Sequence, residues 1–385
     1  MKAMGSIESK LPERFARGWH CIGLDSQFET GELKTLEYFD TRIVIFRGED
    51  GKIRAFNGFC PHMGANLGDG RVVGNTVQCP FHEWRWGDGG MCKHIPYHAA
   101  IPPGARIGTW DVCVENDLVY LWHDHEGLPP ISEQAIPRHR STYEEGWSEW
   151  ALISGVAHSN CRELIDNLAD ASHFSPVHGS PVNSYINASQ GHSYCQMLTG
   201  GNPLIGGDTL RSIAYYYGPS YVIADMTSEV WGKPIESIMM IGSVPITQNK
   251  FVMHFGMKVR ALPELSFAEN QRLVRKYIEQ GQETFFQDLR IWDAKVRVDN
   301  PILCGGDGPL LQLRKWYEQF YVDRSEVDPE IAARKIIVTM RREDTDRWIE
   351  EEHGVQMAGS RAKTFAPSER FGLTTSFPVA ELSAA

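Results

Sequence analysis

Two short stretches of the sequence each place a cysteine and a histidine close together. They read Cys60-x-His62 and Cys79-x-x-His82, and sixteen residues separate His62 from Cys79. A structural zinc finger usually pairs cysteines on one loop and histidines on another. Here each loop mixes the two types, so both thiolates can bind one metal while both imidazoles bind a second. That donor set suits a [2Fe–2S] cluster in which two histidines replace two cysteines on one iron.

A cluster of this kind has a raised reduction potential. This suits a Rieske centre that accepts an electron from a flavin or ferredoxin and passes it on. Pro61, Pro80, Gly64 and Gly68 predict tight loops whose backbone N–H groups can point at the cluster sulfurs. The alternatives are a mixed-ligand zinc site and four unrelated core residues. The spacing and the β-rich surroundings favour the cluster.

A second group of candidate ligands lies further along the chain, at Asp170, His173 and His178. Two histidines and one carboxylate on one face of a metal leave three positions open. This is the facial triad of non-haem Fe(II) oxygenases, in which substrate and O2 share the open side. The alternative is that these polar side chains lie on a solvated helix and bind nothing. An electron-storing cluster needs an acceptor, and this favours the metal site.

These residues belong to a predicted helix over residues 160–174. Three polar residues recur at every third position and would share one face of it, namely Asn167, Asp170 and His173. Pro176 prevents regular continuation of the helix. The chain can then turn so that His178 points back at the same metal.

Asp288 is another candidate for the carboxylate ligand. It lies in a predicted helix over residues 266–294 among bulky apolar residues, where an unpaired carboxylate would be costly. A metal or a cation is therefore expected beside it. We predict Asp288 as the third iron ligand and Asp170 as a hydrogen-bonding partner that orients the imidazole of His173. In that position Asp170 could also carry an electron path from a neighbouring His82.

The elements that position these residues fall into two groups. Residues 19–122 contain short apolar runs separated by Gly and Asp, which predicts a small β-sandwich or barrel. Residues 124–146 are rich in proline and polar residues and predict a linker. From about Trp147 follow a strand, a helix, the strands of residues 205–260 and the long helix 266–294. The fold class is therefore α+β, an all-β module followed by a sheet packed on helices.

Length and charge narrow the classes of protein further. The 385 residues suffice for two or three domains. The net charge of −11, with no run of Lys or Arg, speaks against nucleic acid as a partner. No uncharged stretch reaches the roughly 20 apolar residues that a membrane span requires, and no signal peptide is recognisable. The eight cysteines then predict reduced thiols in the cytoplasm, where clustered Cys and His indicate metal ligands.

With both motifs in this order, the chain resembles the oxygenase component of Rieske non-haem iron oxygenases over nearly its whole length. Among these it is most similar to the 3-ketosteroid 9α-hydroxylase (3-ketosteroid-9-alpha-monooxygenase) family. Beyond the metal motifs, five segments carry this likeness: residues 14–21, 161–167, 217–221, 299–303 and 316–323. Pro61, and Phe174 followed by Ser175 and Pro176, depart from the pattern of the steroid group and leave the exact substrate open.

The resemblance implies an N-terminal all-β Rieske [2Fe–2S] domain over residues 19–135. It also implies a catalytic domain over residues 140–345 with the helix-grip (START-like) fold, an antiparallel sheet with helices. A lead-in of residues 1–18 precedes them, and a C-terminal tail of residues 354–385 follows. The ligands that it implies are Cys60, His62, Cys79 and His82 for the cluster, and His173, His178 and Asp288 for one mononuclear iron. Asp170 falls on the bridging aspartate, and Asn167 joins it among the catalytic residues.

Enzymes of this kind are typically homotrimers, in which the cluster of one subunit faces the iron of the next. A flavin/iron–sulfur reductase passes electrons from NAD(P)H to the cluster, and from there they reach Fe(II). With O2, the enzyme would hydroxylate a hydrophobic 3-ketosteroid at the 9α position. The residues expected to line the substrate pocket are Phe285, Trp292, Tyr215, Met239 and Ile241. Ordinary core packing is the alternative for each of them.

Three other functions stay open on the sequence. A related oxygenase could act on another polycyclic or sterol-like substrate by hydroxylation, desaturation or O-demethylation. A non-catalytic electron-transfer or lipid-binding protein would hold the cluster and no second iron site. A zinc-dependent hydrolase with a structural zinc would hold no iron at all.

Overall fold

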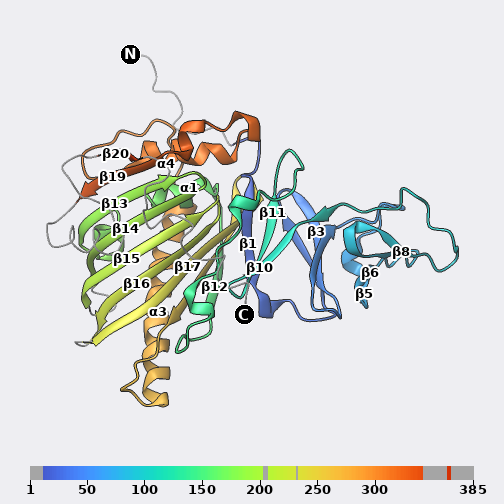
Figure 1. The fold of residues 1–385 in the computed structure, drawn as a ribbon, viewed down its shortest axis with the longest axis horizontal. Coiled ribbons are helices and arrows are strands. Elements are labelled where there is room, and N and C mark those ends of the chain that lie inside the picture. The colour runs from blue at the N-terminus through green and yellow to red at the C-terminus, as the bar shows by residue number, and fades with distance from the viewer. Residues whose placement is uncertain (1–11, 203–206, 231–232, 341–361, 366–385) are drawn as a thin grey trace.

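The computed structural model describes residues 12–202, 207–230, 233–340 and 362–365. Figure 1 shows a large twisted sheet with helices beside it and a group of small sheets at the other end of the molecule. The paired strands run antiparallel, and helices are few. The predicted α+β class is therefore confirmed, with an all-β N-terminal part followed by a sheet that packs against helices.

The N-terminal part contains three small sheets. The outermost has the strand order β5-β6-β7-β8, the next β2-β3-β4-β9, and the third, β1-β11-β10, adjoins the large sheet (Figure 1). The strands are β1 (Gly18–Leu24), β2 (Leu33–Tyr38), β3 (Thr41–Arg47), β4 (Ile53–Asn57), β5 (Arg71–Val73), β6 (Thr76–Gln78), β7 (Arg85–Trp86), β8 (Cys92–His94), β9 (Thr109–Trp110), β10 (Val112–Glu115) and β11 (Leu118–His123). The prediction of short strands over residues 19–122 is confirmed.

The β1-β11-β10 sheet joins the two parts of the molecule. Alternate side chains of β11 pack on its opposite faces, Tyr120 toward the large sheet and Leu121 toward the β2-β3-β4-β9 sheet. On the large sheet, Gly242 approaches Cys21 of β1 closely. A Cβ atom at Gly242 would lie 2.6 Å from the Cβ of Cys21, so only glycine fits there. The two parts therefore share one continuous hydrophobic core.

The large sheet has the strand order β12-β18-β17-β16-β15-β14-β13-β19-β20. From β13 to β18, strands that follow each other along the chain also pair in space, so hairpin connections build most of the sheet. The strands are β12 (Ala151–Ala157), β13 (Val182–Gln190), β14 (Ser193–Asn202), β15 (Gly207–Tyr217), β16 (Tyr221–Val230), β17 (Lys233–Thr247), β18 (Lys250–Val259), β19 (Arg334–Met340) and β20 (Ala362–Phe365).

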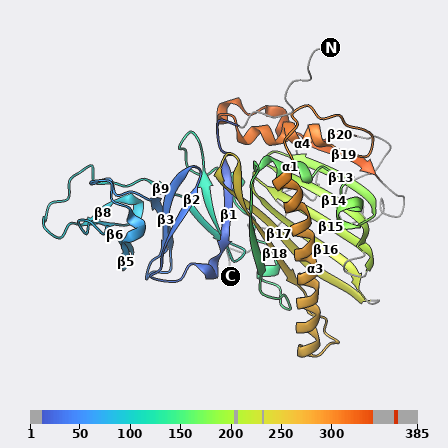
Figure 2. The ribbon, with the colours of Figure 1, turned by 180° about the vertical axis from the view of Figure 1, so that it is seen from behind.

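Helices cover one face of the large sheet. They are α1 (Arg162–Asn167), α2 (Phe174–His178), α3 (Phe267–Ala294) and α4 (Leu310–Tyr317), and Figure 2 shows α3 crossing the sheet. The predicted helix over residues 266–294 is confirmed. Ser266 caps it, accepting a hydrogen bond from the backbone N–H of Glu269 while the Glu269 side chain bonds back. Within the described residues, each helix is too short or too polar to cross a lipid bilayer.

The segment predicted as a linker, residues 124–146, is an ordered connector. Ile136 and His139 in it are buried, and Nε2 of His139 lies 3.2 Å from Oδ2 of Asp225 on β16. The polar residues that suggested a linker thus find partners on the large sheet. The predicted C-terminal tail, residues 354–385, lies outside the described residues except for β20.

Candidate metal centres and active site

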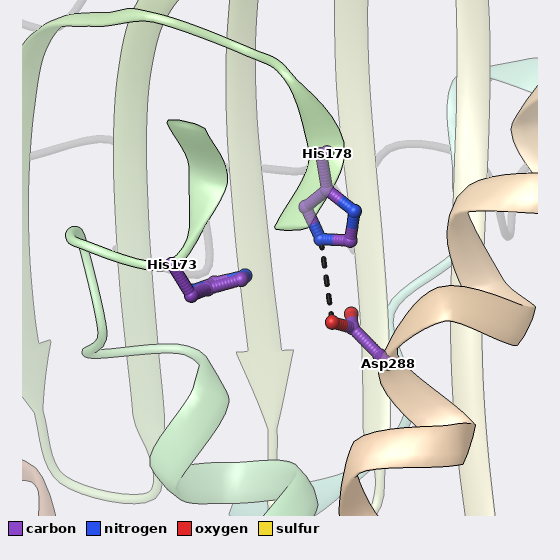
Figure 3. A group of neighbouring side chains, drawn as sticks. All are labelled: His173, His178 and Asp288. Carbon is purple, nitrogen blue, oxygen red and sulfur yellow. Dashed lines mark ion pairs between the residues drawn. The ribbon is translucent and has the colours of Figure 1, made fainter. Parts of the chain in front are cut away.

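The three predicted iron ligands come together between the short helices and α3. His173 precedes α2, His178 ends it, and Asp288 lies on α3. In Figure 3 the three side chains point into one space between the helices and the sheet. One ligand atom from each lies within 4.8 Å of the other two, and Nε2 of His178 is 3.3 Å from Oδ1 of Asp288. Residues far apart in the sequence are thus close enough to share one ion.

The chain reaches this arrangement differently from the prediction. The continuous helix over residues 160–174 is wrong, because α1 ends at Asn167 and α2 begins at Phe174. Pro176 lies in the first turn of α2, where its missing N–H breaks no helical hydrogen bond. It therefore belongs to the start of a helix. Gly179 ends α2 with a φ of +64°, a left-handed conformation that glycine adopts without strain.

Hydrogen bonds fix the direction in which both imidazoles offer a ligand atom. Nδ1 of His173 donates to the backbone carbonyl of Asp170 over 2.7 Å. Nδ1 of His178 donates to Oε1 of Gln287 over 2.9 Å. With the Nδ1 protons used, each Nε2 keeps the lone pair that a metal needs. Two imidazole nitrogens and one carboxylate are the donor set of a facial triad, so these residues fit a mononuclear Fe(II).

The candidate iron site is largely shielded from solvent. The side chains of His173, His178 and Asp288 are 10%, 5% and 14% exposed. Burial acts to lower the pKa of His178, but the hydrogen bond and negative charge of Asp288 outweigh it, so the pKa is raised. Nδ2 of Asn167 donates to Oδ2 of Asp288 over 3.2 Å, which gives both carboxylate oxygens a partner. A buried carboxylate beside two imidazoles is stabilised by a cation.

Asp170 contacts His173 through its backbone. Its carboxylate lies 3.8 Å from Nδ1 of His173, and Oδ1 instead accepts hydrogen bonds from the backbone N–H groups of Ser172 (3.0 Å) and His173 (3.2 Å). Burial acts to raise the pKa of Asp170, but the hydrogen bonds from His173 and Ser172 outweigh it and the pKa is lowered. The side chain is 41% exposed. The charged group of Asp170 therefore reaches the surface beside the buried site.

The four predicted cluster ligands lie on two loops at the end of the N-terminal part that is remote from the large sheet (Figure 1). Cys60 and His62 lie between β4 and β5, and Cys79 and His82 lie between β6 and β7. The rings of His62 and His82 are 4.7 Å apart between centroids. Nδ1 of each ring is buried and has no hydrogen-bond partner in the described chain. Buried nitrogens of this kind are rare unless something binds them.

The geometry of these four residues disfavours a single metal ion. Among the described residues, no three of the four donor atoms lie within 4.8 Å of one another, whereas a tetrahedral zinc needs all four together. Burial raises the pKa of Cys60 to about 11, so a thiolate there needs a cation beside it. Two irons can meet both conditions, with the thiolates on one and the imidazoles on the other. The residues fit a [2Fe–2S] cluster.

An apolar cavity opens beside His178, between α3 and the large sheet. Its volume is about 140 Å³. Its apolar walls consist mainly of Phe174, Leu198, Leu210, Met226, Met239, Phe255 and Met257. Mostly apolar walls with a few polar groups suit a hydrophobic ligand.

Of the five residues predicted to line a substrate pocket, Met239 is the one that lines this cavity. Tyr215 lies on the opposite face of the sheet, packed against the β1-β11-β10 layer, so that prediction is wrong. Successive strand residues alternate between faces, and three tyrosines in a row hide which of them face the cavity. Phe285, Trp292 and Ile241 lie on the cavity side of the sheet, but they pack into the core beside the cavity.

Two family models match the chain. Residues 18–106 match the Rieske [2Fe-2S] domain, and residues 121–321 match the 3-ketosteroid 9alpha-hydroxylase C-terminal domain. The chain belongs to the 3-ketosteroid 9α-hydroxylase oxygenase family. It is thus a Rieske-type oxygenase and an oxidoreductase, and its Rieske domain carries a [2Fe–2S] cluster.

Individual members of the 3-ketosteroid 9α-hydroxylase family align over most of their length. The "3-ketosteroid-9-alpha-monooxygenase, oxygenase component" of Rhodococcus rhodochrous is 38% identical over 339 residues, 85% of this chain and 86% of that protein. The protein of the same name from Mycobacterium tuberculosis is 38% identical over 350 residues, 88% of this chain and 90% of that protein. A more distant relative, the cholesterol 7-desaturase nvd of Bombyx mori, is 27% identical and covers 84% of this chain and 73% of its own.

Solved structures share the fold of this chain. Dicamba monooxygenase bound to dicamba aligns with a TM-score of 0.64 at 19% identity, over 80% of this chain and 97% of that one. Pseudomonas putida NdmB aligns with a TM-score of 0.65 at 20% identity, over 84% of this chain and 97% of that one. At these identities the likeness concerns the fold alone.

Sequence reasoning missed three residues that support the site. Gln287 holds the ring of His178, and its position directly before Asp288 was the signal that could have found it. The hydroxyl of Tyr185 and Nε2 of Gln196 both donate to the backbone carbonyl of Leu168, over 2.7 and 2.8 Å, just after α1. These two residues lie on strands, and no motif links them to the ligands.

Proposed function

We propose that this chain is the oxygenase component of a monooxygenase that hydroxylates a 3-ketosteroid, at the 9α position. The observation that carries the proposal is the placement of the His173, His178 and Asp288 group beside an apolar cavity. The names of the relatives from Rhodococcus and Mycobacterium support the same substrate class. In this proposal the cavity holds the steroid. The candidate metal ligands adjoin the steroid through His178, which forms part of the cavity wall.

The two metal centres would be held by two different sets of residues. Cys60, Cys79, His62 and His82 would hold the cluster, and His173, His178 and Asp288 would hold one Fe(II). When bound, this iron supplies the activation of O2 that inserts oxygen into an unactivated C–H bond.

The protein's own residues prepare this chemistry by position. Gln287 and the Asp170 carbonyl keep both imidazole Nδ1 atoms protonated and both Nε2 atoms free. Asn167 holds Oδ2 of Asp288 in place. The apolar walls of the cavity exclude water from the reacting carbon, which limits unproductive reduction of O2.

Electrons would come from NAD(P)H through a flavin and iron–sulfur reductase. Within one chain, the cluster loops belong to the small outer sheets, whereas the candidate iron site lies beside α3 and the large sheet, on the other side of the β1-β11-β10 layer (Figure 1). This separation supports a homotrimer in which the cluster of one copy serves the iron of the next. Asp170 reaches the surface next to the iron site and lines a surface pocket there, so it is our candidate for the crossing point.

Metal analysis and one substitution test the proposal. The oxygenase predicts about three irons per chain, a bare electron carrier about two, and a zinc hydrolase none. His173→Ala should abolish hydroxylation of a 3-ketosteroid while the EPR signal of the reduced cluster is unchanged. Hydroxylation that survives in this variant would refute the assignment of the iron ligands.

Desaturation of a sterol-like substrate is the second candidate. The name of the Bombyx mori relative, cholesterol 7-desaturase, favours it. The mass of the product separates the two reactions, because hydroxylation adds one oxygen atom and desaturation removes two hydrogen atoms.

We further propose the division of the chain into a Rieske domain over residues 19–135 and a catalytic domain over residues 140–345. The continuous core between the β1-β11-β10 layer and the large sheet indicates that the two would act as one body. A cytoplasmic location fits the free cysteines of the described chain.

A further inference from the structure

Most hydrogen-bond donors that line the cavity already have a partner within the protein. Tyr277 shares its hydroxyl with Ser228 (3.2 Å) and Ser237 (3.1 Å). The hydroxyl of Thr284 donates to the backbone carbonyl of Gln280 over 3.4 Å. These groups are therefore engaged within the protein.

The donors nearest the candidate iron site are also taken. Nε2 of Gln196 donates to the Leu168 carbonyl and to the hydroxyl of Tyr185. The hydroxyl of Ser180 makes a long bond of 3.5 Å to the carbonyl of His178. The Nδ1 proton of His178 goes to Gln287.

Ser212 is the exception among the described residues of the cavity wall. It lies on β15, 8% exposed, directly opposite Met226 on β16 and Leu198 on β14. Its hydroxyl forms no hydrogen bond with any residue that the structure describes. The Ser212 oxygen is not among the fully buried unpaired atoms of the described chain, so its hydroxyl faces the open space of the cavity, where an acceptor on a ligand can take up the hydrogen bond.

We propose that the Ser212 hydroxyl donates a hydrogen bond to a carbonyl oxygen of the bound steroid. Ser212 thereby selects an apolar ligand that carries a hydrogen-bond acceptor at one end, and it fixes which carbon faces His178 and Asp288. The inference rests on the proposed function, since it concerns how the proposed substrate lies in its cavity. A site built to donate a hydrogen bond rejects an analogue without the acceptor, because the donor then stays unpaired.

Binding of three matched steroids to the holoenzyme under argon tests this role. The steroids are androstenedione, which has one carbonyl on ring A and one on ring D, and two analogues that each lack one of these oxygens. Equilibrium dialysis gives the dissociation constants without turnover. Ser212→Ala should weaken androstenedione binding about fivefold to tenfold. It should leave unchanged the binding of the analogue that lacks the oxygen which Ser212 contacts. Ser212→Cys, which keeps the side-chain size and a weak donor, should give an intermediate loss.

Thr284→Val is the matched control, because it removes a hydroxyl from the same cavity that already has a protein acceptor. It should affect the three steroids equally. If Ser212→Ala also affects all three equally, or affects none, the inference is overturned while the proposed substrate class stands. If the wild-type protein binds none of the steroids, the substrate class itself is wrong, and the inference falls with it.

Discussion

Nδ1 of His178 lies 2.9 Å from Oε1 of Gln287. The next residue of α3, Asp288, faces Nε2 of the same imidazole over 3.3 Å. Two consecutive side chains of one helix thus act on opposite nitrogens of one ring. One sets the proton on Nδ1, and the other would share the metal with Nε2.

Removing the Gln287 contact should weaken iron binding. Gln287→Leu leaves Nδ1 of His178 without an acceptor, so the ring loses its fixed orientation, and we expect an iron affinity about 10-fold to 100-fold lower. Competition with a chelator measures it. Gln271→Leu, the same change at an exposed position of α3, is the control. Equal iron affinity in the two variants would contradict this role for Gln287.

Asp170→Asn should separate iron binding from electron delivery. The amide keeps an oxygen for the N–H groups of Ser172 and His173, and the Asp170 carbonyl still holds the ring of His173. We therefore expect an unchanged iron content but reoxidation of the reduced cluster slower by about tenfold or more. A single-turnover experiment with steroid and O2, followed by cluster absorbance, measures this rate. Loss of iron in this variant would instead mean that the carboxylate holds the site together.

Gly281→Ala should narrow the cavity without weakening the helix. A Cβ atom at Gly281 would lie 2.2 Å from Sδ of Met257, so the flexible end of Met257 must move. Alanine favours a helix interior by about 1 kcal/mol over glycine. We expect an unchanged or higher melting temperature together with steroid binding weaker by about tenfold. Met257→Ala in the same chain should restore binding, and a failure to do so would rule out the steric explanation.

Acid should destabilise the protein in part through His20. Burial lowers the pKa of this histidine from 6.5 to about 4, although the carbonyls of Ala16 and Ser243 partly offset the effect. Between these values protons bind the unfolded chain more readily, so this contribution to stability is complete above pH 6.5 and is lost as the pH falls toward 4. Its size is up to about 3 kcal/mol. Denaturant unfolding at several pH values should show a smaller acid sensitivity for His20→Gln, and an identical pH dependence would exclude this role.

Spacing predicted the cluster loops and the long helix well, because both depend on local sequence. The mixed Cys and His pairs are compatible with few structures other than metal-binding loops. The residues after Ser266 are likewise compatible with little other than a helix. Asp288 could be named as a ligand candidate because a carboxylate among apolar side chains needs a partner. Its placement beside His173 and His178 is a tertiary contact, which the structure shows and the local sequence does not.

The failures have physical reasons as well. From the sequence, Pro176 predicts the end of a helix, although proline is equally compatible with a first turn. The sequence also predicts Tyr215 in the pocket. Strand residues alternate between the two faces of a sheet, however, and a run of three tyrosines does not show which of them face the cavity. That the Ser212 hydroxyl has no partner within the described residues can be recognised only when the positions of all neighbouring polar groups are known. No sequence motif could indicate it.

The structural boundary between the N-terminal part and the large-sheet part does not coincide with the end of the Rieske match at residue 106. β1 lies within that match, but its pairing partner β11 lies beyond it, and both pack on the large sheet. In a chimaera made by swapping residues 18–106 between relatives, β1 from one protein would therefore have to pair with β11 from the other. Exchanging only β2 to β9 would transfer the cluster loops and leave β1 paired with its own β11.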